Sequence, residues 1–407
     1  MNRGAIWIIN QYGGTPYHGM VFRSYYVALA LIKKGYSVYV FSASYTHLLI
    51  NPPNCSQNFS HEKIDGINYI WTKVQVYKKS KSLKRALSLI TFPLRLLNFD
   101  YKSIEQPKVI VVSSPSPTPV FVAHKWAQKL NAQLFFEVRD LWSLSMTEVG
   151  GVSDYNPYVL LMKLSENFAY RKAKKVISLL PDAKKIMVKK GLKEEKFLHI
   201  PNAIYEHSQD LIELPDQIVG KIPKDKFIVG YSGTLGIANS IDHLIRAAQL
   251  LKSESNIVFL LVGTGGEMDI LQNLALGLNN VIFLGHIEKK YIASVIKCFN
   301  VCYIGLVNQN LFQYGVSPNK LFDYMISAKP IIYSINSSNN YVRDSGCGIV
   351  VEPENSEAIA SAVRKFSVMS SDELFEIGEL GRDFVIKNFT YDIIIEKYVK
   401  AIENVYP

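Results

Sequence analysis

The sequence predicts an α/β protein of two domains, each built around its own parallel β-sheet. The chain has 407 residues, of which 48% are hydrophobic. This length is too great for one ordinary core and suits two domains of about 200 residues each. Short runs of β-branched and aromatic residues alternate with longer helical patterns. Such alternation is typical of parallel sheets that are covered by helices on both faces.

The strand and helix pattern occurs twice along the chain. A polar stretch near 205–225 separates the two series, and the junction falls near the "IPNA" that begins at Ile200. From 356 onward the charged segments have helical periodicity, so the tail should be helical. In the first half, strands are expected at 5–10, 35–44, 109–115, 134–138 and 175–181, with a helix at 22–34; in the second half, strands are expected at 227–233, 257–263, 281–286, 301–306, 330–335 and 348–352.

Cysteine usage and hydropathy exclude several classes of protein. The four cysteines have no paired spacing typical of zinc ligands, and reduced thiols suit a cytoplasmic protein. The N-terminus does not read as an export signal, and no run of 18 uncharged apolar residues occurs. We therefore expect a soluble or peripheral protein.

The net charge of +10 is concentrated in the first half of the chain. Residues 1–200 carry 28 Lys and Arg against 12 Asp and Glu, whereas residues 201–407 carry 17 against 23. This asymmetry indicates that one domain meets an anionic ligand or surface, such as nucleic acid or acidic lipid. The aromatic and basic pattern of a recognised nucleic-acid module is absent, which disfavours nucleic acid.

The segment "SPNKLFDYM", 317–325, predicts a helix with two charges near its start. Ser317 suits the N-cap, Pro318 suits the first helical position, and the helix should run to about Ser327. Lys320 and Asp323 would then share one face near the positive helix end, where an anion is favoured. The alternative interpretation is a solvated ion pair between these two side chains.

Three glycine-rich turns follow predicted strands. They are "NQYGGTPYHG" from Asn10, "SGTLG" from Ser232 and "VGTGGE" from Val262. Glycine after a parallel strand lets the backbone approach a phosphate or sugar closely. Each turn alone could be free of ligand, but together they favour a nucleotide ligand at the carboxyl ends of the strands.

In combination, these segments resemble the family 4 glycosyltransferases, which have the two-domain GT-B architecture. The resemblance is strongest to the branch that assembles bacterial surface polysaccharides, which includes the N-acetylfucosamine transferase of O-antigen synthesis. The segments that carry it are Gly13 with Gly14, "RDLW" from Arg139, "PNA" from Pro201, "SGTLG", "VGTGGE", "FLGHI" from Phe283, "SPNKLFDYM", "AKPII" from Ala328, "VEP" from Val351 and "FTYD" from Phe389.

The resemblance implies an architecture of two facing Rossmann-like domains with the active site in the cleft between them. Residues 1–200 would bind the acceptor, and residues 201–385 would bind the nucleotide-sugar. The closing helix, 386–407, would pack back on the N-terminal domain.

The resemblance also assigns donor-binding residues. Lys320 would offset the charge of the donor diphosphate, and Asp323 would hold the ribose hydroxyls. The loops around Glu267 and His286 would hold the base. The full donor set is Gly13, Gly14, Gly233, Thr234, Gly263, Glu267, Gly285, His286, Ser317, Pro318, Asn319, Lys320 and Asp323.

On the N-terminal side, "RDLW" is expected to line the active site. Arg139 could contact a phosphate, and Asp140 could orient the acceptor hydroxyl; with Lys320 they form the predicted catalytic set. His18 is a further candidate on the acceptor side. The alternatives are a structural Arg139–Asp140 pair and an inert loop histidine.

Two departures from the family pattern affect the donor site. The family has an acidic residue eight positions before Asp323, where this chain has Gly315. Many relatives carry an arginine and a lysine after the "SGTLG" turn, where this chain has Ala238, Asn239 and Ser240. Lys320 should therefore carry more of the leaving-group charge.

The chain contains no Asp-x-Asp pair, so we expect catalysis without a metal or other cofactor. The resemblance implies retention of anomeric configuration, with the acceptor proton passing to a donor phosphate oxygen. Lys320, the helix terminus and the amides of Gly13 and Gly14 would stabilise the departing diphosphate. Uridine diphosphate is the expected nucleotide, with guanosine diphosphate as the alternative.

The segment 77–99 interleaves basic and leucine-rich positions. This pattern suits an amphipathic helix on the anionic inner face of the plasma membrane, where a lipid-linked acceptor could be reached. The alternative is a core helix with a solvated basic end. Two rival functions also remain: a nucleotide-sugar 2-epimerase of the same architecture, and a non-enzymatic bilobed binding protein.

Overall fold

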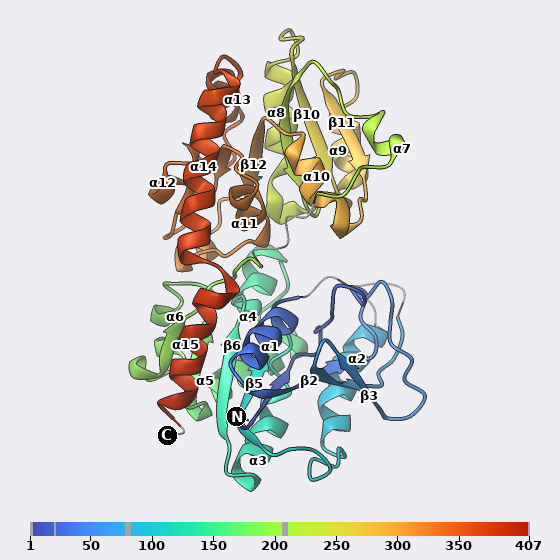
Figure 1. The fold of residues 1–407 in the computed structure, drawn as a ribbon, viewed down its shortest axis with the longest axis vertical. Helices are drawn as coiled ribbons and strands as arrows, with labels where there is room; N and C mark the ends of the chain where they lie inside the picture. Colours follow the sequence, from blue (N-terminus) through green and yellow to red (C-terminus); the bar gives the residue numbers. More distant parts are fainter. Residues whose placement is uncertain (1–2, 20–21, 78–82, 206–210, 406–407) are drawn as a thin grey trace. The chain divides into compact units, whose positions relative to one another are not determined.

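The computed structural model describes residues 3–19, 22–77, 83–205 and 211–405, and it divides the chain into two compact units (Figure 1). Unit 1 comprises Met1–Asn202 together with Tyr391–Pro407, and unit 2 comprises Ala203–Thr390. The predicted boundaries were residues 200 and 385. The chain thus leaves unit 1, forms unit 2 and returns to unit 1 at its end.

Unit 1 contains an eight-stranded sheet in the order β3-β4-β2-β1-β5-β6-β7-β8. All neighbouring strands are parallel except β3 and β4, which form an antiparallel hairpin at the sheet edge. The strands are β1 (Ala5–Ile9), β2 (Ser37–Ala43), β3 (Phe59–Ile64), β4 (Ile67–Thr72), β5 (Pro107–Ser113), β6 (Gln133–Val138), β7 (Lys175–Ser178) and β8 (Phe197–His199).

The β3–β4 hairpin and the short strand β8 were not predicted. The exposed middle of β3 is the polar sequence "HEK", which hides its strand character. Asp65 and Gly66 join the two strands, and both have positive φ, at 48° and 84°. An Asp-Gly turn of this kind is the usual signal of a tight hairpin, and it was available in the sequence.

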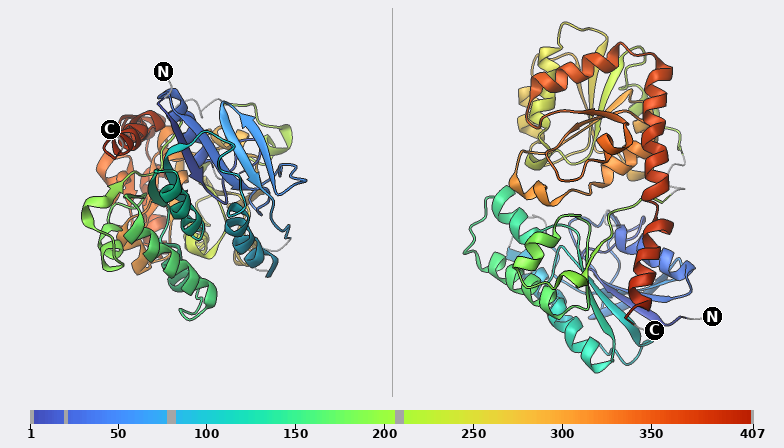
Figure 2. Two further views of the ribbon diagram at one scale, coloured as in Figure 1. Left: turned by 90° about the horizontal axis from the view of Figure 1, so that it is seen from below. Right: turned by 90° about the vertical axis from the view of Figure 1, so that its left-hand side faces the viewer.

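Helices cover both faces of the unit 1 sheet. The last helix of the chain, α15, packs beside α1, so the C-terminus completes this unit (Figure 2). Right-handed crossovers place α2, α3 and α5 on the opposite face. The α-helices of this unit are α1 (Arg23–Lys33), α2 (Leu83–Leu96), α3 (Val120–Lys129), α4 (Trp142–Leu144), α5 (Pro157–Lys172), α6 (Lys184–Lys189) and α15 (Tyr391–Glu403).

Unit 2 contains a six-stranded, fully parallel sheet in the order β11-β10-β9-β12-β13-β14. The strands are β9 (Phe227–Ser232), β10 (Ile257–Val262), β11 (Val281–Gly285), β12 (Val301–Gly305), β13 (Ile331–Ser334) and β14 (Gly348–Val350). All six were predicted. Successive residues enter hydrophobic clusters on opposite faces of the sheet, which is why these strands read as continuous apolar runs.

The helical tail predicted after residue 356 is also present. Its helices are α13, α14 and α15, of which α15 belongs to unit 1. The α-helices of unit 2 are α7 (Asp216–Val219), α8 (Ile241–Leu250), α9 (Met268–Leu274), α10 (Ile292–Lys297), α11 (Asn319–Ile326), α12 (Tyr341–Ser345), α13 (Ser356–Ser367) and α14 (Ser371–Asn388).

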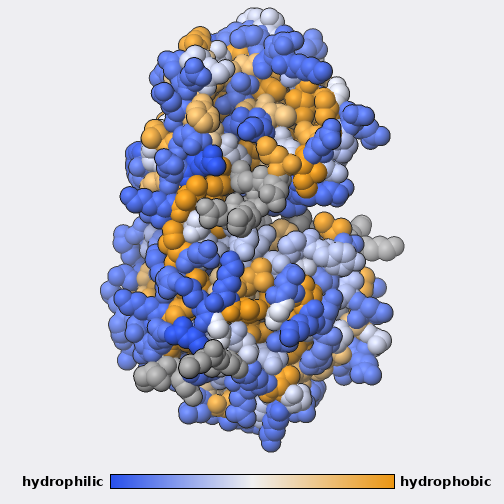
Figure 3. Space-filling model, viewed as in Figure 1, coloured by the Kyte–Doolittle hydropathy of each residue, from blue (hydrophilic) through white to orange (hydrophobic). Residues whose placement is uncertain are grey.

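The viewed surface of each unit is largely hydrophilic, with small hydrophobic patches between the polar side chains (Figure 3). Within the described ranges, none of the helices combines the length and the apolar character that crossing a membrane requires.

Candidate functional site

Lys320 lies in the first turn of α11 and reaches back over the carboxyl end of β9. Its ammonium donates hydrogen bonds to the Tyr231 hydroxyl at 2.7 Å and to the Asn239 side-chain oxygen at 2.8 Å. The ammonium also lies 4.4 Å from the centroid of the Tyr231 ring, within the range of a cation–π contact. The sequence predicted the position of Lys320 but neither of these partners.

The start of α11 differs from the prediction. The helix begins at Asn319, and Pro318, with an extended ψ of 128°, occupies the N-cap position that was expected for Ser317. Proline offers no side-chain acceptor, so the N-cap residue itself contributes no side-chain hydrogen bond to the helix. The N–H of Leu321 instead bonds the carbonyl of Pro318 at 3.1 Å. Ser317 therefore lies in the loop before the helix.

Lys320, Tyr231 and Asn239 form a closed hydrogen-bond network that includes one main-chain carbonyl. Tyr231 and Asn239 each donate to the carbonyl oxygen of Thr234, at 2.7 and 3.0 Å. Burial raises the pKa of Tyr231 well above its usual value, so the phenol keeps its proton and accepts from Lys320. The hydrogen bonds therefore hold the ammonium in a fixed place.

The charge of Lys320 has no carboxylate to balance it. In the described parts of the chain, no Asp or Glu oxygen lies within ion-pair distance of its ammonium. Burial lowers the pKa of Lys320 to about 7. A bound anion would favour the protonated form and raise this pKa. A negatively charged group beside Lys320 would therefore be favoured over a neutral one.

Asp323 does not pair with Lys320. Its carboxylate instead forms an ion pair of 3.2 Å with Lys289, whose side chain is 59% exposed. The interpretation of Lys320 and Asp323 as a solvated pair with each other is therefore wrong for the described residues. The two side chains keep the three-residue spacing but have separate environments.

The glycine turns of unit 2 are hydrogen-bonded to one another. Gly233 donates to the Val262 carbonyl, and Gly263 donates to the Gly285 carbonyl. A Cβ on Gly263 would lie 1.9 Å from the Gly233 oxygen, and Gly233, Gly263 and Gly285 all have positive φ. Close packing at Gly263 and the positive φ at all three positions are thus sufficient to favour glycine here. Around these turns, Thr234 and His286 are exposed and Glu267 is half-buried.

Gly315 occupies a position that disfavours any side chain. Its φ is 99°, a conformation that strains L-residues. An acidic residue at this position would therefore need a different backbone, and any contact here must come from main-chain atoms.

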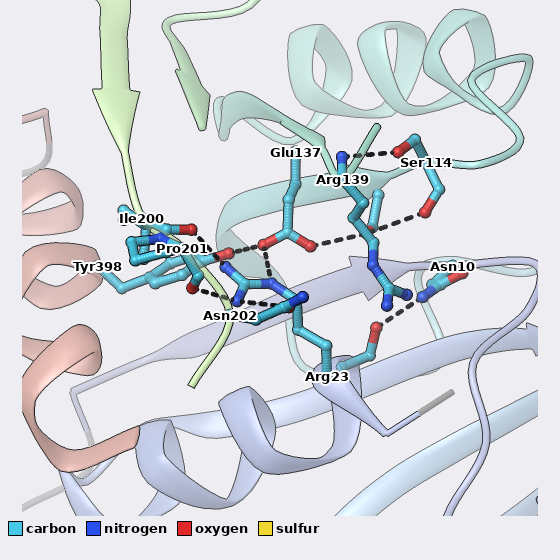
Figure 4. Close-up of polar contacts among 11 residues, drawn as sticks. Asn10, Arg23, Ser114, Glu137, Arg139, Ile200, Pro201, Asn202 and Tyr398 are labelled. Carbon is cyan, nitrogen blue, oxygen red and sulfur yellow. Dashed lines mark hydrogen bonds and ion pairs between the residues drawn. The ribbon is translucent and has the colours of Figure 1, made fainter. Parts of the chain in front are cut away.

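In unit 1, a buried ion pair lies beside the predicted Arg139 (Figure 4). The Arg23 guanidinium contacts the Glu137 carboxylate at 3.0 Å, and both residues are only 3% exposed. Ser113 and Tyr398 also donate to this carboxylate. Burial acts most strongly and would raise the pKa of Glu137, but Arg23, Arg139 and the hydrogen bonds from Tyr398 and Ser113 together outweigh it, and the pKa is lowered. The carboxylate is thus fully ionised and fully partnered.

Arg23 also fixes the chain where it leaves unit 1. Its terminal nitrogens donate to the carbonyls of Pro201 and Ile200, at 2.7 and 3.0 Å. Since Tyr398 comes from α15, this one cluster joins α1, β6, the exit segment and the C-terminal helix (Figure 4).

Arg139 follows β6 and points toward Asn10 (Figure 4). Its backbone N–H bonds the Ser114 hydroxyl at 2.9 Å. Among the described residues its guanidinium forms neither a hydrogen bond nor an ion pair, and the expected structural alternative of an Arg139–Asp140 pair is not found. Asp140 is exposed. Arg139 therefore has capacity to bind an anion.

The loop after β1 is tightly folded. Gly13 packs so closely that a Cβ would lie 2.3 Å from the Ser42 hydroxyl, and the carbonyl of Gly14 accepts from Tyr69. His18 is 3% exposed, and its Nδ1 lies 2.8 Å from the Thr15 hydroxyl. Burial lowers the pKa of His18, which keeps the ring neutral at neutral pH.

Among the described residues of the segment 77–99, a helix covers Leu83–Leu96, α2. Lys78, Lys79 and Lys81 lie outside the described residues. One face of α2 is buried, yet the opposite face exposes an apolar stripe, so neither sequence interpretation alone describes it. The stripe consists of Leu87, Ile90, Leu94 and Leu97, the last just beyond the helix.

Sequence reasoning missed Tyr231, Asn239, Arg23, Glu137 and Tyr398. Glu137 carried a usable signal, because a charge inside the apolar run "LFFEV" predicts a buried partner. Asn239 was identified only as a residue in the stretch where many relatives carry a cation, and its contact with Lys320 was not predicted. Within the residues described, no group of three His, Cys, Asp or Glu side chains could hold a metal ion.

Unit 2 contains a segment that matches a known sequence family. Residues 226–367 match the sequence family described as Glycosyl transferases group 1. The chain is 25% identical over 222 residues to WcaI of Escherichia coli, a glycosyl transferase assigned to colanic acid biosynthesis, covering 51% of this chain and 53% of WcaI. An uncharacterized glycosyltransferase of Methanocaldococcus jannaschii is 25% identical over 46% of each chain. The chain thus spans about half the length of the curated relatives it matches.

Solved structures match over the whole length. Sucrose-phosphate synthase of Thermosynechococcus elongatus has a TM-score of 0.76 with 18% identity, covering 99% of both chains. HepE of Anabaena, solved with UDP and glucose, has a TM-score of 0.67 with 14% identity, covering 98% of this chain and 100% of HepE. At such identity the likeness shows the fold alone. The predicted fold class, two Rossmann-like α/β domains of the GT-B type, is confirmed, and residues 226–367 form a group 1 glycosyl transferase domain.

Proposed function

We propose that this protein is a family 4 glycosyltransferase that transfers a sugar from a nucleotide-sugar, a UDP-sugar in the first instance, to a lipid-linked or saccharide acceptor. The reaction would retain anomeric configuration and would require no metal. It would serve the assembly of a bacterial surface polysaccharide, in the branch that resembles the N-acetylfucosamine transferases.

One observation carries this proposal: an ammonium held without a carboxylate partner in a group 1 glycosyl transferase domain. Lys320 is fixed by Tyr231 and Asn239 above the glycine turn after β9. A departing nucleoside diphosphate gains negative charge as the glycosyl bond breaks. A cation that is already oriented stabilises that charge with little reorganisation. The N-terminus of α11 would add to this stabilisation.

The roles of the other donor residues follow from the resemblance and from their positions. Asp323 would exchange its exposed partner Lys289 for the ribose hydroxyls. Because Gly315 has no side chain, main-chain atoms there would contact the donor sugar. Glu267 and His286 would lie toward the base, and the amides of Gly13 and Gly14 toward the diphosphate.

Arg139 and Asp140 support an acceptor role for unit 1. Arg139 offers a guanidinium without a bonded anion among the described residues, and Asp140 is exposed beside it. Asp140 would orient the acceptor hydroxyl and Arg139 would bind a phosphate. The relative WcaI is assigned to colanic acid biosynthesis, and the structural neighbour WaaG to lipopolysaccharide biosynthesis, which supports a polysaccharide pathway.

The exposed stripe of α2 supports attachment to the cytoplasmic face of the plasma membrane. Leu87, Ile90 and Leu94 recur at helical spacing on one face and are each 44% exposed or more. Lys84 and Arg95 lie beside this face, where acidic headgroups would attract them.

Flotation on phosphatidylglycerol vesicles tests the attachment. Ile90→Glu with Leu94→Glu should abolish flotation, because it places charge in the apolar stripe. Val368→Glu in unit 2 is the matched control, since Val368 is also highly exposed but lies far along the chain from α2. If the wild-type protein stays with the soluble fraction, membrane attachment is wrong.

Thermal unfolding against a panel of nucleoside diphosphates tests the donor. At a ligand concentration about a hundredfold above Kd, selective binding should stabilise the folded protein by about 3 kcal/mol and so raise its melting temperature. UDP should act most strongly, with GDP as the alternative.

Incubation with the matching nucleotide-sugar and no acceptor then distinguishes a transferase from the rival epimerase, because an epimerase would convert the sugar. Product NMR reports the anomeric configuration, and chelator treatment tests metal independence.

A further inference from the structure

The strands β9 and β12 are neighbours in the sheet of unit 2, but they pair over only a short stretch. Their ladder ends where Gly230 of β9 faces Cys302 of β12, whereas β9 itself continues to Ser232. On its other side, β9 stays paired with β10 as far as Ser232. Among the described residues, the end of β9 therefore has no strand partner on the β12 side.

The main chain of Ser232 faces the side where this partner is missing. The N–H of Gly233, the next residue, donates to the Val262 carbonyl of β10. Because successive residues of a parallel strand bond to opposite neighbours, the N–H and carbonyl of Ser232 are directed to the β12 side. Ser232 is only 8% exposed, so both groups need partners within the protein.

The phenol of Tyr324 supplies both partners. Its hydroxyl accepts from the N–H of Ser232 at 2.8 Å and donates to the carbonyl of the same residue at 3.2 Å. Tyr324 belongs to α11 and is fully buried. Burial raises the pKa of the phenol well above its usual value, so the proton that it donates is retained. A side chain of α11 thus takes the place that a longer β12 would occupy.

The helix α11 therefore contacts the end of β9 at two points. Lys320 and Tyr324 are four residues apart and share one helix face. Lys320 bonds to Tyr231, and Tyr324 bonds to Ser232, the next residue of the strand. The glycine turn follows at once, and a Cβ on Gly233 would lie 2.9 Å from the Lys320 nitrogen. The ammonium lies against the turn, so a small shift of the strand end would separate them.

The separation of β9 from β12 also coincides with a reversal in the order of the strands. The chain runs from β9 through β10 to β11 and then returns to the other side of β9 to form β12. In open parallel sheets, ligands bind beyond the carboxyl ends of the strands at such a reversal. A phenol that fixes the strand end at this place can therefore control how a ligand is met.

We propose that Tyr324 is a positioning residue of the donor site, which holds the end of β9 so that Lys320 and the turn at Gly233 meet the diphosphate together. Without the phenol, the N–H and carbonyl of Ser232 would be buried without partners, and the strand end would move to regain them. This inference rests on the proposed function. It adds a residue that acts through Lys320 and does not itself touch the nucleotide.

Calorimetric titration of the full-length protein with UDP tests this role. Tyr324→Phe removes only the hydroxyl, and the affinity for UDP should fall about tenfold, since two buried main-chain groups lose their partner. Tyr398→Phe is the matched control, because it removes a similarly buried phenol from unit 1. The control should lower the melting temperature while changing UDP affinity less than about twofold. Equal UDP affinity of Tyr324→Phe and wild type would overturn the proposal.

A double-mutant cycle separates positioning from a general loss of stability. In the Lys320→Ala background, Tyr324→Phe should weaken UDP binding less than about twofold, because the cation that the phenol positions is gone. A loss of about tenfold in both backgrounds would show that Tyr324 acts independently of Lys320, and it would overturn the proposal.

Hydrogen exchange of the wild-type protein replaces these titrations if Tyr324→Phe does not fold, as judged by its melting temperature. UDP should slow exchange of the Ser232 amide more than that of Ile332 in β13, because the ligand and the phenol would hold the same strand end. Equal changes at the two amides would overturn the proposal.

The outcomes also distinguish this inference from the proposed function. If the wild-type protein binds UDP and Tyr324→Phe binds it equally well, the donor function stands and only the positioning role is rejected. If the wild-type protein binds no nucleoside diphosphate, the donor function is rejected and this inference with it. GDP replaces UDP in each titration if the wild-type protein selects it.

Discussion

The two units each hold a cation at the carboxyl end of a sheet, buried in unit 1 and partly buried in unit 2, but they treat the charge in opposite ways. In unit 1, Arg23 meets the Glu137 carboxylate and two main-chain carbonyls. In unit 2, Lys320 meets a phenol and an amide, both neutral. A buried ion pair with every group satisfied is a structural element, whereas a partly buried cation with neutral partners keeps its capacity for an anion.

The difference also indicates which residues should tolerate change. Removing one partner from the unit 1 cluster leaves a charge buried without compensation, so stability should suffer. Removing Lys320 takes away a charge whose burial the fold opposes, so activity should suffer while stability does not.

The largest effect is expected from Glu137→Leu, which leaves Arg23 buried without its counter-ion. Breaking such a pair costs about 3–5 kcal/mol of unfolding free energy. Urea denaturation at neutral pH measures it. The control is Glu254→Leu, which breaks the half-exposed pair with Arg364 and should cost less than about 1 kcal/mol. A loss for Glu137→Leu as small as the control would contradict the structural role.

Lys320→Ala should lower the rate of sugar transfer by about 100- to 1000-fold, as loss of one preorganised donor does at an anionic transition state. Its melting temperature should stay the same or rise. Lys289→Ala, which removes a nearby exposed lysine, should leave the rate nearly unchanged. Activity of Lys320→Ala within about threefold of wild type, near 0.7 kcal/mol of barrier, would exclude the proposed role.

The pKa of about 7 for Lys320 predicts a pH dependence of donor binding. The diphosphate binds the protonated form, so affinity is full below pH 7. Above pH 7 the ammonium deprotonates in the unbound protein, and affinity should fall by up to about tenfold per pH unit. The affinity should level off once the pH exceeds the pKa of Lys320 in the complex, which the bound diphosphate raises. Calorimetric titration from pH 6 to 9 checks this; a flat profile would mean that Lys320 stays charged throughout.

The ionisation of Lys320 should also affect folding stability, but here a higher pH is favourable, whereas it weakens donor binding. The folded pKa of Lys320 is below its unfolded value of 10.5, so the unfolded chain binds more protons between these values. Unfolding free energy should therefore rise with pH from 7 to 10.5 in wild type relative to Lys320→Met. Denaturation of both proteins at each pH isolates this group from the other ionisable residues.

Asn239→Asp should weaken donor binding by about tenfold, because a carboxylate beside the ammonium would compete with the diphosphate. Asn239→Ala removes one hydrogen bond without adding charge and should cost about 1 kcal/mol of donor affinity or less. Equal effects of the two substitutions would show that hydrogen bonding, and not charge, matters at this position.

The smallest effect is expected at Asp323. Asp323→Asn should raise KM for the nucleotide-sugar several-fold, because a neutral amide is a weaker acceptor for ribose hydroxyls. Stability should change by less than about 1 kcal/mol, since the pair with Lys289 is largely exposed. Lys289→Ala breaks the same pair and should leave KM unaltered; a matching rise would assign the effect to the pair.

Strand periodicity predicted most of the fold, because the central strands are buried on both faces and read as apolar runs. The β3 strand was not predicted because the exposed residues in its middle are polar, and β8 was not predicted because it has only three residues. Ser317 was assigned to the N-cap by residue preference, yet the loop geometry gives that position to Pro318. At this position the conformation of the loop, and not the N-cap preference of serine, determines where the helix begins.

The candidate site was only partly predictable. A motif placed Lys320, but its partners Tyr231 and Asn239 lie 89 and 81 residues earlier, a separation that spacing rules do not bridge. The same holds for Arg23 and Tyr398, which meet Glu137 across 114 and 261 residues.

The return of the chain to unit 1 also sets an order for synthesis. Tyr398 donates to Glu137 from α15, so unit 1 lacks one of its core contacts until residue 398 has been translated. Unit 2 is contiguous in sequence and can complete its core earlier. On the ribosome, the second unit should therefore mature before the first, the reverse of their order in the gene.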